Sequence, residues 1–179
     1  MLNRILADRR GVSAIEFALI APVMALLYLG LAALTLCMMA ERRAGHATSV
    51  VGDLTSQAPA TSNATLNDIL TIGNTIVRPA APADLSIRIT NVQSDASGNP
   101  RVIWSKSTGT ALPKLAQNSI VADLPAGLIS VNESIVKTDL RFNYDSFIKQ
   151  ILPRQIHFSE TYYHRPRRTE LITCADCPP

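Results

Sequence analysis

The apolar pattern is strongest near the start of the chain, where residues 17–40 contain no charged side chain. A helix of this length would extend roughly 36 Å, since each residue adds about 1.5 Å. That exceeds the ~30 Å hydrocarbon layer of a bilayer. The pattern therefore predicts one membrane-spanning helix.

Helical spacing continues past this stretch, with polar residues such as Thr48 on the rest of the helical wheel. The apolar positions recur at i, i+3, i+7 and i+10: Ala44, Ala47, Val51 and Leu54. This spacing is typical of an amphipathic helix. The sequence SQAP at 56–59 ends the pattern, because the residue before a proline avoids helical backbone. We therefore predict one long helix through residue 57.

A second, short helix is predicted next, with Thr65 and Asp68 as its N-terminal capping pair. Its apolar positions are Leu66, Ile69, Leu70, Gly73 and Val77. The period then changes to two, and residues 85–90 alternate as a half-buried strand. Turn residues at 95–100 and an apolar run at 102–104 complete a predicted hairpin.

Two further strands are predicted at residues 136–144 and 156–162, where apolar and polar positions alternate. Phe147, Ile148 and Ile151 favour a helical turn between them. Residues 107–127 are expected to form a surface loop or a partial helix. Helices followed by antiparallel strands predict an α+β fold, with a long N-terminal transmembrane helix and a small globular domain containing an antiparallel sheet.

The composition gives no support to one class of function, nucleic-acid binding. The net charge of +3 and the 5% of aromatic residues give no basis for nucleic-acid binding. The length after the apolar stretch suits a single compact domain. The stretch is also longer than the ~7–15-residue core of a secretory signal peptide, so the helix is expected to stay on the protein.

The junction before the apolar stretch carries the most informative chemistry. Residues 9–17 read RRGVSAIEF, so Arg9 and Arg10 precede Gly11, and Glu16 follows five residues after the glycine. An unpaired carboxylate at the head of an apolar helix costs on the order of a few kcal/mol. The position of Glu16 therefore needs a specific explanation.

This junction resembles the processing site of bacterial type IV prepilins, and more narrowly that of the TadE-like minor pilins (pseudopilins) of the tight-adherence, or Flp, pilus. The resemblance implies that a membrane prepilin peptidase cleaves between Gly11 and Val12, with Arg9 and Arg10 holding the leader on the cytoplasmic side. Glu16 would become the fifth residue of the mature chain. At that position pilins are thought to pair the carboxylate with the free α-amine of a neighbouring subunit, which sets the register between subunits.

The resemblance also implies an organisation and a set of partners. The chain would divide into a leader peptide at 1–11, a transmembrane and amphipathic helix at 12–57 and a periplasmic α+β domain at 58–179. The protein would be a single-pass protein of the bacterial inner membrane with a cytoplasmic N-terminus, and it would take part in pilus assembly at initiation, tip or base. Its partners would be the prepilin peptidase, other minor pilins, the major pilin, the inner-membrane assembly platform and the membrane.

Other segments extend the resemblance along the chain. The sequences DLT at 53–55, VIWS at 102–105 and YYHRPR at 162–167 look like recurrent TadE-like features. Pro22 is expected to kink or loosen the first helix. A stripe of small residues that would allow close helix packing follows the i, i+4, i+7, i+11 spacing: Ala14, Ala18, Ala21 and Ala25.

Cys174 and Cys177 form a C-x-x-C pair near the end of the sequence. Because Pro178 and Pro179 follow, we expect no helix to lower a thiol pKa there. A periplasmic location favours a structural disulfide. A metal site would need two more ligands, with only His164 nearby in sequence, so no metal and no cofactor are expected. A thiol–disulfide enzyme stays open as a weaker alternative.

His157, Ser159 and Glu160 lie close in sequence, but on a strand Glu160 would face away from the other two. No catalytic residue is therefore predicted, and the protein is not expected to be an enzyme. The basic run at 164–168 is expected to be a solvated strand end or to contact an acidic surface. The alternative to a pilin is a single-pass membrane anchor with a periplasmic binding or interaction domain, in which Glu16 stays hydrated at headgroup depth.

Overall fold

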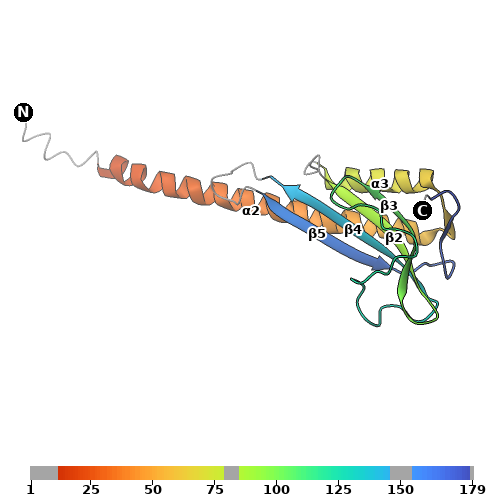
Figure 1. Cartoon of the computed structure of the whole chain (residues 1–179). Helices are drawn as coiled ribbons and strands as arrows, with labels where there is room; N and C mark the ends of the chain where they lie inside the picture. Colours follow the sequence, from red (N-terminus) through yellow and green to blue (C-terminus); the bar gives the residue numbers. More distant parts are fainter. Residues whose placement is uncertain (1–11, 79–84, 146–154, 178–179) are drawn as a thin grey trace, which may run out of the picture.

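The computed structural model describes residues 12–78, 85–145 and 155–177. Arg9, Arg10 and Gly11 of the predicted leader lie outside these described residues, as does the helical turn predicted at residues 147–151. In the described part, a long helix projects from a small domain made of a second helix and a sheet (Figure 1). The predicted α+β fold is confirmed.

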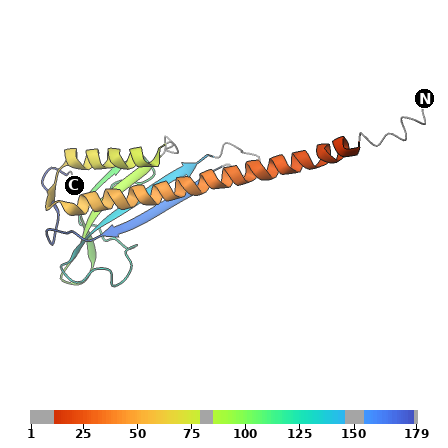
Figure 2. The same ribbon diagram turned by 180° about the vertical axis from the view of Figure 1, so that it is seen from behind.

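The long helix, α2, spans Val12–Gln57 as one element that includes Pro22. Its first half extends away from the domain, and its second half lies along the sheet beside the second helix (Figures 1 and 2). The contact is close because it uses small residues. A Cβ added at Gly52 would lie 2.9 Å from Thr138 Oγ1 and would overlap the ring of His164. We call the first part of the helix, residues 12–39, the free half, because its large side chains are exposed. We call residues 40–57 the packed half, because Ala40 and the later apolar residues lie in the core of the domain.

The second helix, α3, spans Asn63–Val77 and folds back along α2 (Figure 2). Ser62 caps it: its backbone is extended, and its hydroxyl accepts a hydrogen bond from the Thr65 N–H at 3.2 Å. The prediction that Thr65 and Asp68 form the cap is wrong. Thr65 already lies inside the helix, where its N–H is one of the donors that a cap satisfies. The predicted apolar face is confirmed, since its five residues are all buried.

Four antiparallel strands form the main sheet in the order β3-β2-β4-β5. The strands are β2 (Ser86–Ser94), β3 (Pro100–Thr108), β4 (Ser134–Tyr144) and β5 (Ile156–His164). The predicted hairpin and the two later strands are confirmed. A separate parallel pair joins β1 (Ala60–Thr61) to β6 (Thr173–Cys174). Strands of two residues have no detectable period, so the sequence pattern did not reveal this pair.

One face of the main sheet packs on α2 and α3 in an apolar core. Its buried members include Val51, Leu66, Leu70, Ile87, Trp104, Leu140 and Phe142. Gly73 lets the layers approach, because a Cβ there would lie 2.7 Å from Val51 Cγ2 and 2.9 Å from Ile87 Cδ1. Full burial of one large aliphatic side chain is worth about 1.5–3 kcal/mol. This core therefore holds the second half of α2 firmly to the domain.

The loop at residues 109–133 covers the other face of the sheet. A second apolar cluster there joins Val92, Val102, Val121, Leu124, Leu128 and Ile135. Ser86 and Thr90 of β2 are fully buried. The prediction of a half-buried strand at 85–90 is therefore wrong, because β2 is a central strand whose polar face is shielded by the loop. Thr48 of α2, which we had placed off the apolar face, is also fully buried, since the helix contacts both α3 and the sheet.

Candidate functional site

The free half of α2 exposes an apolar surface. Its large side chains between residues 15 and 39 are 41% to 72% exposed, and Phe17 and Tyr28 reach 72% each. Exposed apolar surfaces of this extent mark membrane or protein contacts. By length and composition, α2 can cross a membrane.

Glu16 lies within this surface, between the exposed side chains of Ile15 and Phe17. α2 begins at Val12, so Glu16 is the fifth residue of the helix. In the part of the chain that the structure describes, its carboxylate has no hydrogen-bond or ion-pair partner. Because an unpaired carboxylate is costly in an apolar medium, Glu16 is a candidate for a contact made outside the described residues.

The predicted stripe of small residues also lies on the free half. Ala14, Ala18 and Ala25 are exposed and Ala21 is partly exposed. Small side chains in a row leave the helix backbone open to close approach by another helix. The carboxylate and the stripe thus share one unpacked segment.

The packed half of α2 ends at an ion pair and a hydrogen bond with the segment that follows β5. The Arg167 guanidinium pairs with the Asp53 carboxylate, and the Arg167 N–H donates to Ser56 O at 3.0 Å. Arg165 contacts Glu133 instead, with 3.4 Å between the charged groups. The basic run at 164–168 is thus partly used inside the molecule, which residue order alone did not indicate.

The His164 ring lies next to this ion pair and contacts Gly52 of α2. Burial is the main effect and lowers the pKa of His164; Asp53 acts to raise it and Arg167 to lower it. A histidine with a lowered pKa binds protons more weakly when folded than when unfolded. The contribution of His164 to stability therefore falls as the pH drops through about 6.5.

We expect the thermal midpoint of the full chain in detergent to be lower at pH 5.5 than at pH 7.5. In the His164→Gln variant this decrease should be smaller than in the wild type. Differential scanning calorimetry measures both. The matched control is His46→Gln, because His46 is an exposed histidine of α2, the helix against which His164 packs. If His164→Gln keeps the full pH dependence of the wild type, the assignment to His164 is wrong.

Two of the three later segments that look TadE-like contact each other, and the third bonds to the tail of the domain. Arg167 of the segment 162–167 pairs with Asp53 of the segment 53–55. The Trp104 indole N–H and the Asn91 amide both donate to Ile172 O, each at 2.8 Å. Because Ile172 is fully buried, these bonds fix the tail against the sheet.

The tail beyond β6 forms a small loop closed by a disulfide between Cys174 and Cys177, whose Cα atoms are 5.5 Å apart. The loop presents Asp176 to the start of α3, where the Asn63 N–H donates to its carboxylate at 3.0 Å. A carboxylate suits the N-terminus of a helix, where N–H groups lack partners. Asp176 shares a potential ligand cluster with the two cysteines, but its oxygens already serve α3.

A network of charged side chains is buried under the 109–133 loop. Lys137 is only 1% exposed and pairs with Asp123 of the loop. That hydrogen bond is the main reason why the pKa of Asp123 is lowered. Arg88 Nη2 lies 2.7 Å from Asp139 Oδ2, and Lys137 Nζ lies 3.6 Å from Asp139 Oδ1. Strand alternation predicts a polar face for these residues but gives no sign of the loop that covers it, so the network is not visible in the sequence pattern.

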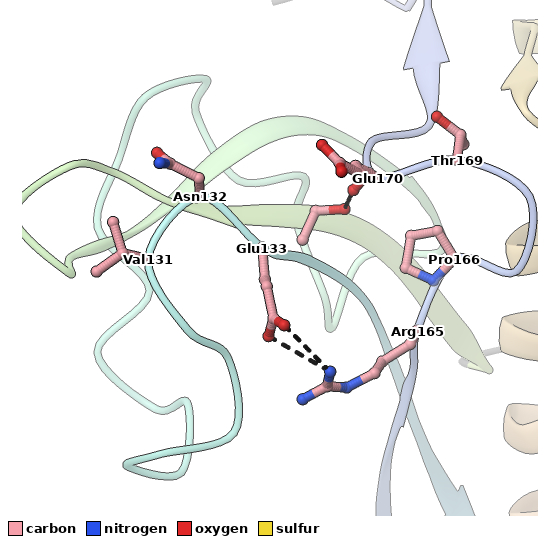
Figure 3. A pocket seen from close by; sticks show the side chains of 8 residues that line it. Val131, Asn132, Glu133, Arg165, Pro166, Thr169 and Glu170 are labelled. Carbon is pink, nitrogen blue, oxygen red and sulfur yellow. Dashed lines mark hydrogen bonds and ion pairs between the residues drawn. The ribbon is translucent and has the colours of Figure 1, made fainter.

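Figure 3 shows a pocket of about 320 Å³ at the end of the domain away from the free half of α2. It lies between residues 131–134 and 165–170. Arg165 crosses it toward Glu133 and also donates to Leu128 O at 3.1 Å. The Ser130 N–H first, and then Arg165, lower the pKa of Glu133. The polar groups of this pocket largely bond to one another.

The polar residues of β5 are divided between its two faces. His157 and Ser159 lie on the face away from α2, where His157 Nδ1 contacts Asn143 Oδ1. Glu160 lies on the other face, and its Oε2 is 3.9 Å from the position of a Cβ on Gly45. The three side chains therefore do not form a hydrolase-like arrangement.

These features define a class of protein. Among the described residues, one helix can cross a membrane, and it carries in its free half a carboxylate with no partner there. A small α+β domain is packed on its other half. This organisation fits a single-pass membrane anchor.

Residues 11–52 match the family model described as TadE-like protein. The matched segment contains Gly11, Val12 and Glu16 and lies almost entirely within α2. The resemblance to the TadE-like family is thereby confirmed for the segment that runs from Gly11 through most of α2. Comparisons with the curated proteins and with the solved structures gave no match.

Proposed function

We propose that this protein is a minor pilin of a tight-adherence pilus. A prepilin peptidase removes residues 1–11, and the chain that begins at Val12 takes part in pilus assembly for surface adherence. The N-terminus of the precursor is cytoplasmic and the domain is periplasmic. Arg9 and Arg10 favour that orientation, because basic residues flanking a membrane helix stay on the cytoplasmic side.

The observation that carries this proposal is Glu16 on the free half of α2. It is exposed, lacks a partner among the described residues and is the fifth residue from Val12. Cleavage before Val12 would create an α-amine at the head of the same apolar surface. A carboxylate and an ammonium from neighbouring chains cost far less in an apolar environment as a pair than alone.

The free half of α2 and the domain on its packed half are suited to different roles. The large apolar side chains of the free half remain exposed beside the domain, so this surface can enter a membrane or a helical bundle (Figure 1). The domain would contact other minor pilins, the major pilin and the assembly platform. We propose that the protein is a substrate of the peptidase and has no catalytic role of its own.

The test is the intact mass of the membrane-extracted protein, from strains with and without the prepilin peptidase. We expect a chain beginning at Val12 only where the peptidase is present. Gly11→Leu, which puts a bulky side chain at the cleaved bond, should block processing. Ala7→Leu adds the same bulk within the leader and should leave processing intact. Retention of residues 1–11 in both strains would reject the processed-pilin function and favour a plain membrane anchor with a binding domain.

A further inference from the structure

A second pocket, of about 330 Å³, lies on the face of the sheet away from α2. In the ladder between β4 and β5, Arg141 lies directly opposite Ser159, and Asn143 lies opposite His157. All four residues line the pocket. They come from the ends of the two strands that lie nearest to the free half of α2 (Figure 1).

The depth of this pocket relative to a membrane follows from the contacts of β5 with α2. Near the far end of α2, His164 lies against Gly52. Four residues earlier, Glu160 lies beside Gly45, and the charge of Glu41 contributes, after burial, to raising the pKa of Glu160. β5 therefore runs along α2, and Glu160 is level with residues 41–45. That level is just past residue 40, where the uncharged stretch ends.

Ser159 and His157 lie one and three residues nearer the membrane than Glu160. At about 3.3 Å per strand residue, they are roughly 3 Å and 10 Å closer to it. The headgroup layer on each side of a bilayer is about 5–8 Å thick. The pocket therefore lies at the depth of the lipid headgroups when the uncharged stretch spans the membrane.

The pocket has the charge of an anion site. Arg141 is exposed, and its guanidinium has no partner in the described part of the chain. None of the described residues that line the pocket carries a carboxylate. The contact of His157 Nδ1 with Asn143 Oδ1 leaves Nε2 free of that bond, so the imidazole can present Nε2 to a ligand.

We propose that this pocket binds the phosphate of an anionic phospholipid headgroup in the leaflet next to the domain. Arg141 donates to the phosphate oxygens, and His157 and Ser159 complete the set of polar contacts. The bound lipid fixes the height and the rotation of the domain on the membrane before assembly. This inference rests on membrane anchoring of α2 and does not depend on processing at Gly11.

Native mass spectrometry of the full chain tests the proposal. The protein is released from detergent micelles that contain equal amounts of phosphatidylglycerol and phosphatidylcholine, and the ratio of the two retained lipids is measured. We expect phosphatidylglycerol to be retained in excess, and Arg141→Gln to lower the ratio about fivefold, as expected for one arginine near an anionic surface. The matched control, Arg168→Gln, removes another exposed arginine with no partner in the described chain and should leave the ratio unchanged.

Three outcomes would overturn the proposal. They are an unchanged ratio in Arg141→Gln, an equal drop in Arg168→Gln, and displacement of phosphatidylglycerol by millimolar inorganic phosphate. The last result would identify a site for the free anion instead of a lipid. A thermal midpoint equal to that of the wild type shows that Arg141→Gln is folded. Because unprocessed protein can be used, failure here is separate from failure of the pilin function.

Discussion

Replacing Glu16 by alanine should reduce the amount of assembled pili more than tenfold while the protein still enters the membrane. The carboxylate lies in an apolar surface without a partner among the described residues, so its removal costs the monomer nothing in lost contacts. In an assembly, the α-amine of a neighbouring Val12 would lose its counter-charge. An uncompensated buried charge costs several kcal/mol, and each 1.4 kcal/mol is tenfold.

The measurement is a complementation assay in a strain that lacks this gene, with sheared surface pili quantified and membrane fractions probed for the protein. Glu41→Ala is the matched control, since Glu41 is an exposed glutamate of the same helix just beyond the uncharged stretch. We expect it to restore pili fully. Normal piliation with Glu16→Ala would show that the carboxylate does not set the register between subunits.

Replacing Asp139 by asparagine should lower the free energy of unfolding by about 3–5 kcal/mol, the usual cost of removing one partner from a buried ion pair. Asp139 accepts from Arg88 Nη2 at 2.7 Å and from the Thr161 hydroxyl at 2.8 Å. Lys137 Nζ lies 3.6 Å away. The asparagine keeps the shape but leaves the buried Arg88 without its counter-charge and Lys137 with Asp123 alone.

Chemical unfolding of the full chain in detergent, followed by tryptophan fluorescence, measures this change. Trp104 is the single tryptophan and is 4% exposed, so its emission reports on the core. Asp95→Asn is the matched control, because Asp95 pairs with Arg101 at an exposed turn. We expect a much smaller effect there, as for surface pairs in general. Equal effects of the two substitutions would show that the network under the loop adds no more to stability than an exposed ion pair.

Local patterns were sufficient for the two helices and for the four strands of the main sheet. The uncharged stretch, the apolar stripe through Val51 and the alternation along β4 each reflect a period that one face of a helix or strand imposes on its own residues. The junction from Arg9 to Glu16 identified the family for the same reason, since its residues act as a contiguous segment. The cap of α3 was misplaced because Ser62 and Thr65 are both good capping residues, and only the backbone angles distinguish them.

Local patterns could not predict the contacts between segments that are distant in the sequence. Sequence alone determined that a membrane-type helix headed by Glu16 is followed by a second helix and then by strands, because periodicity and local chemistry are properties of neighbouring residues. Only the tertiary structure decided that the 109–133 loop buries Lys137, that Arg167 pairs with Asp53, and that Arg141 and His157 line one pocket. Those pairings depend on strand order and on the angle between α2 and the sheet, which are set by the packing of the whole core.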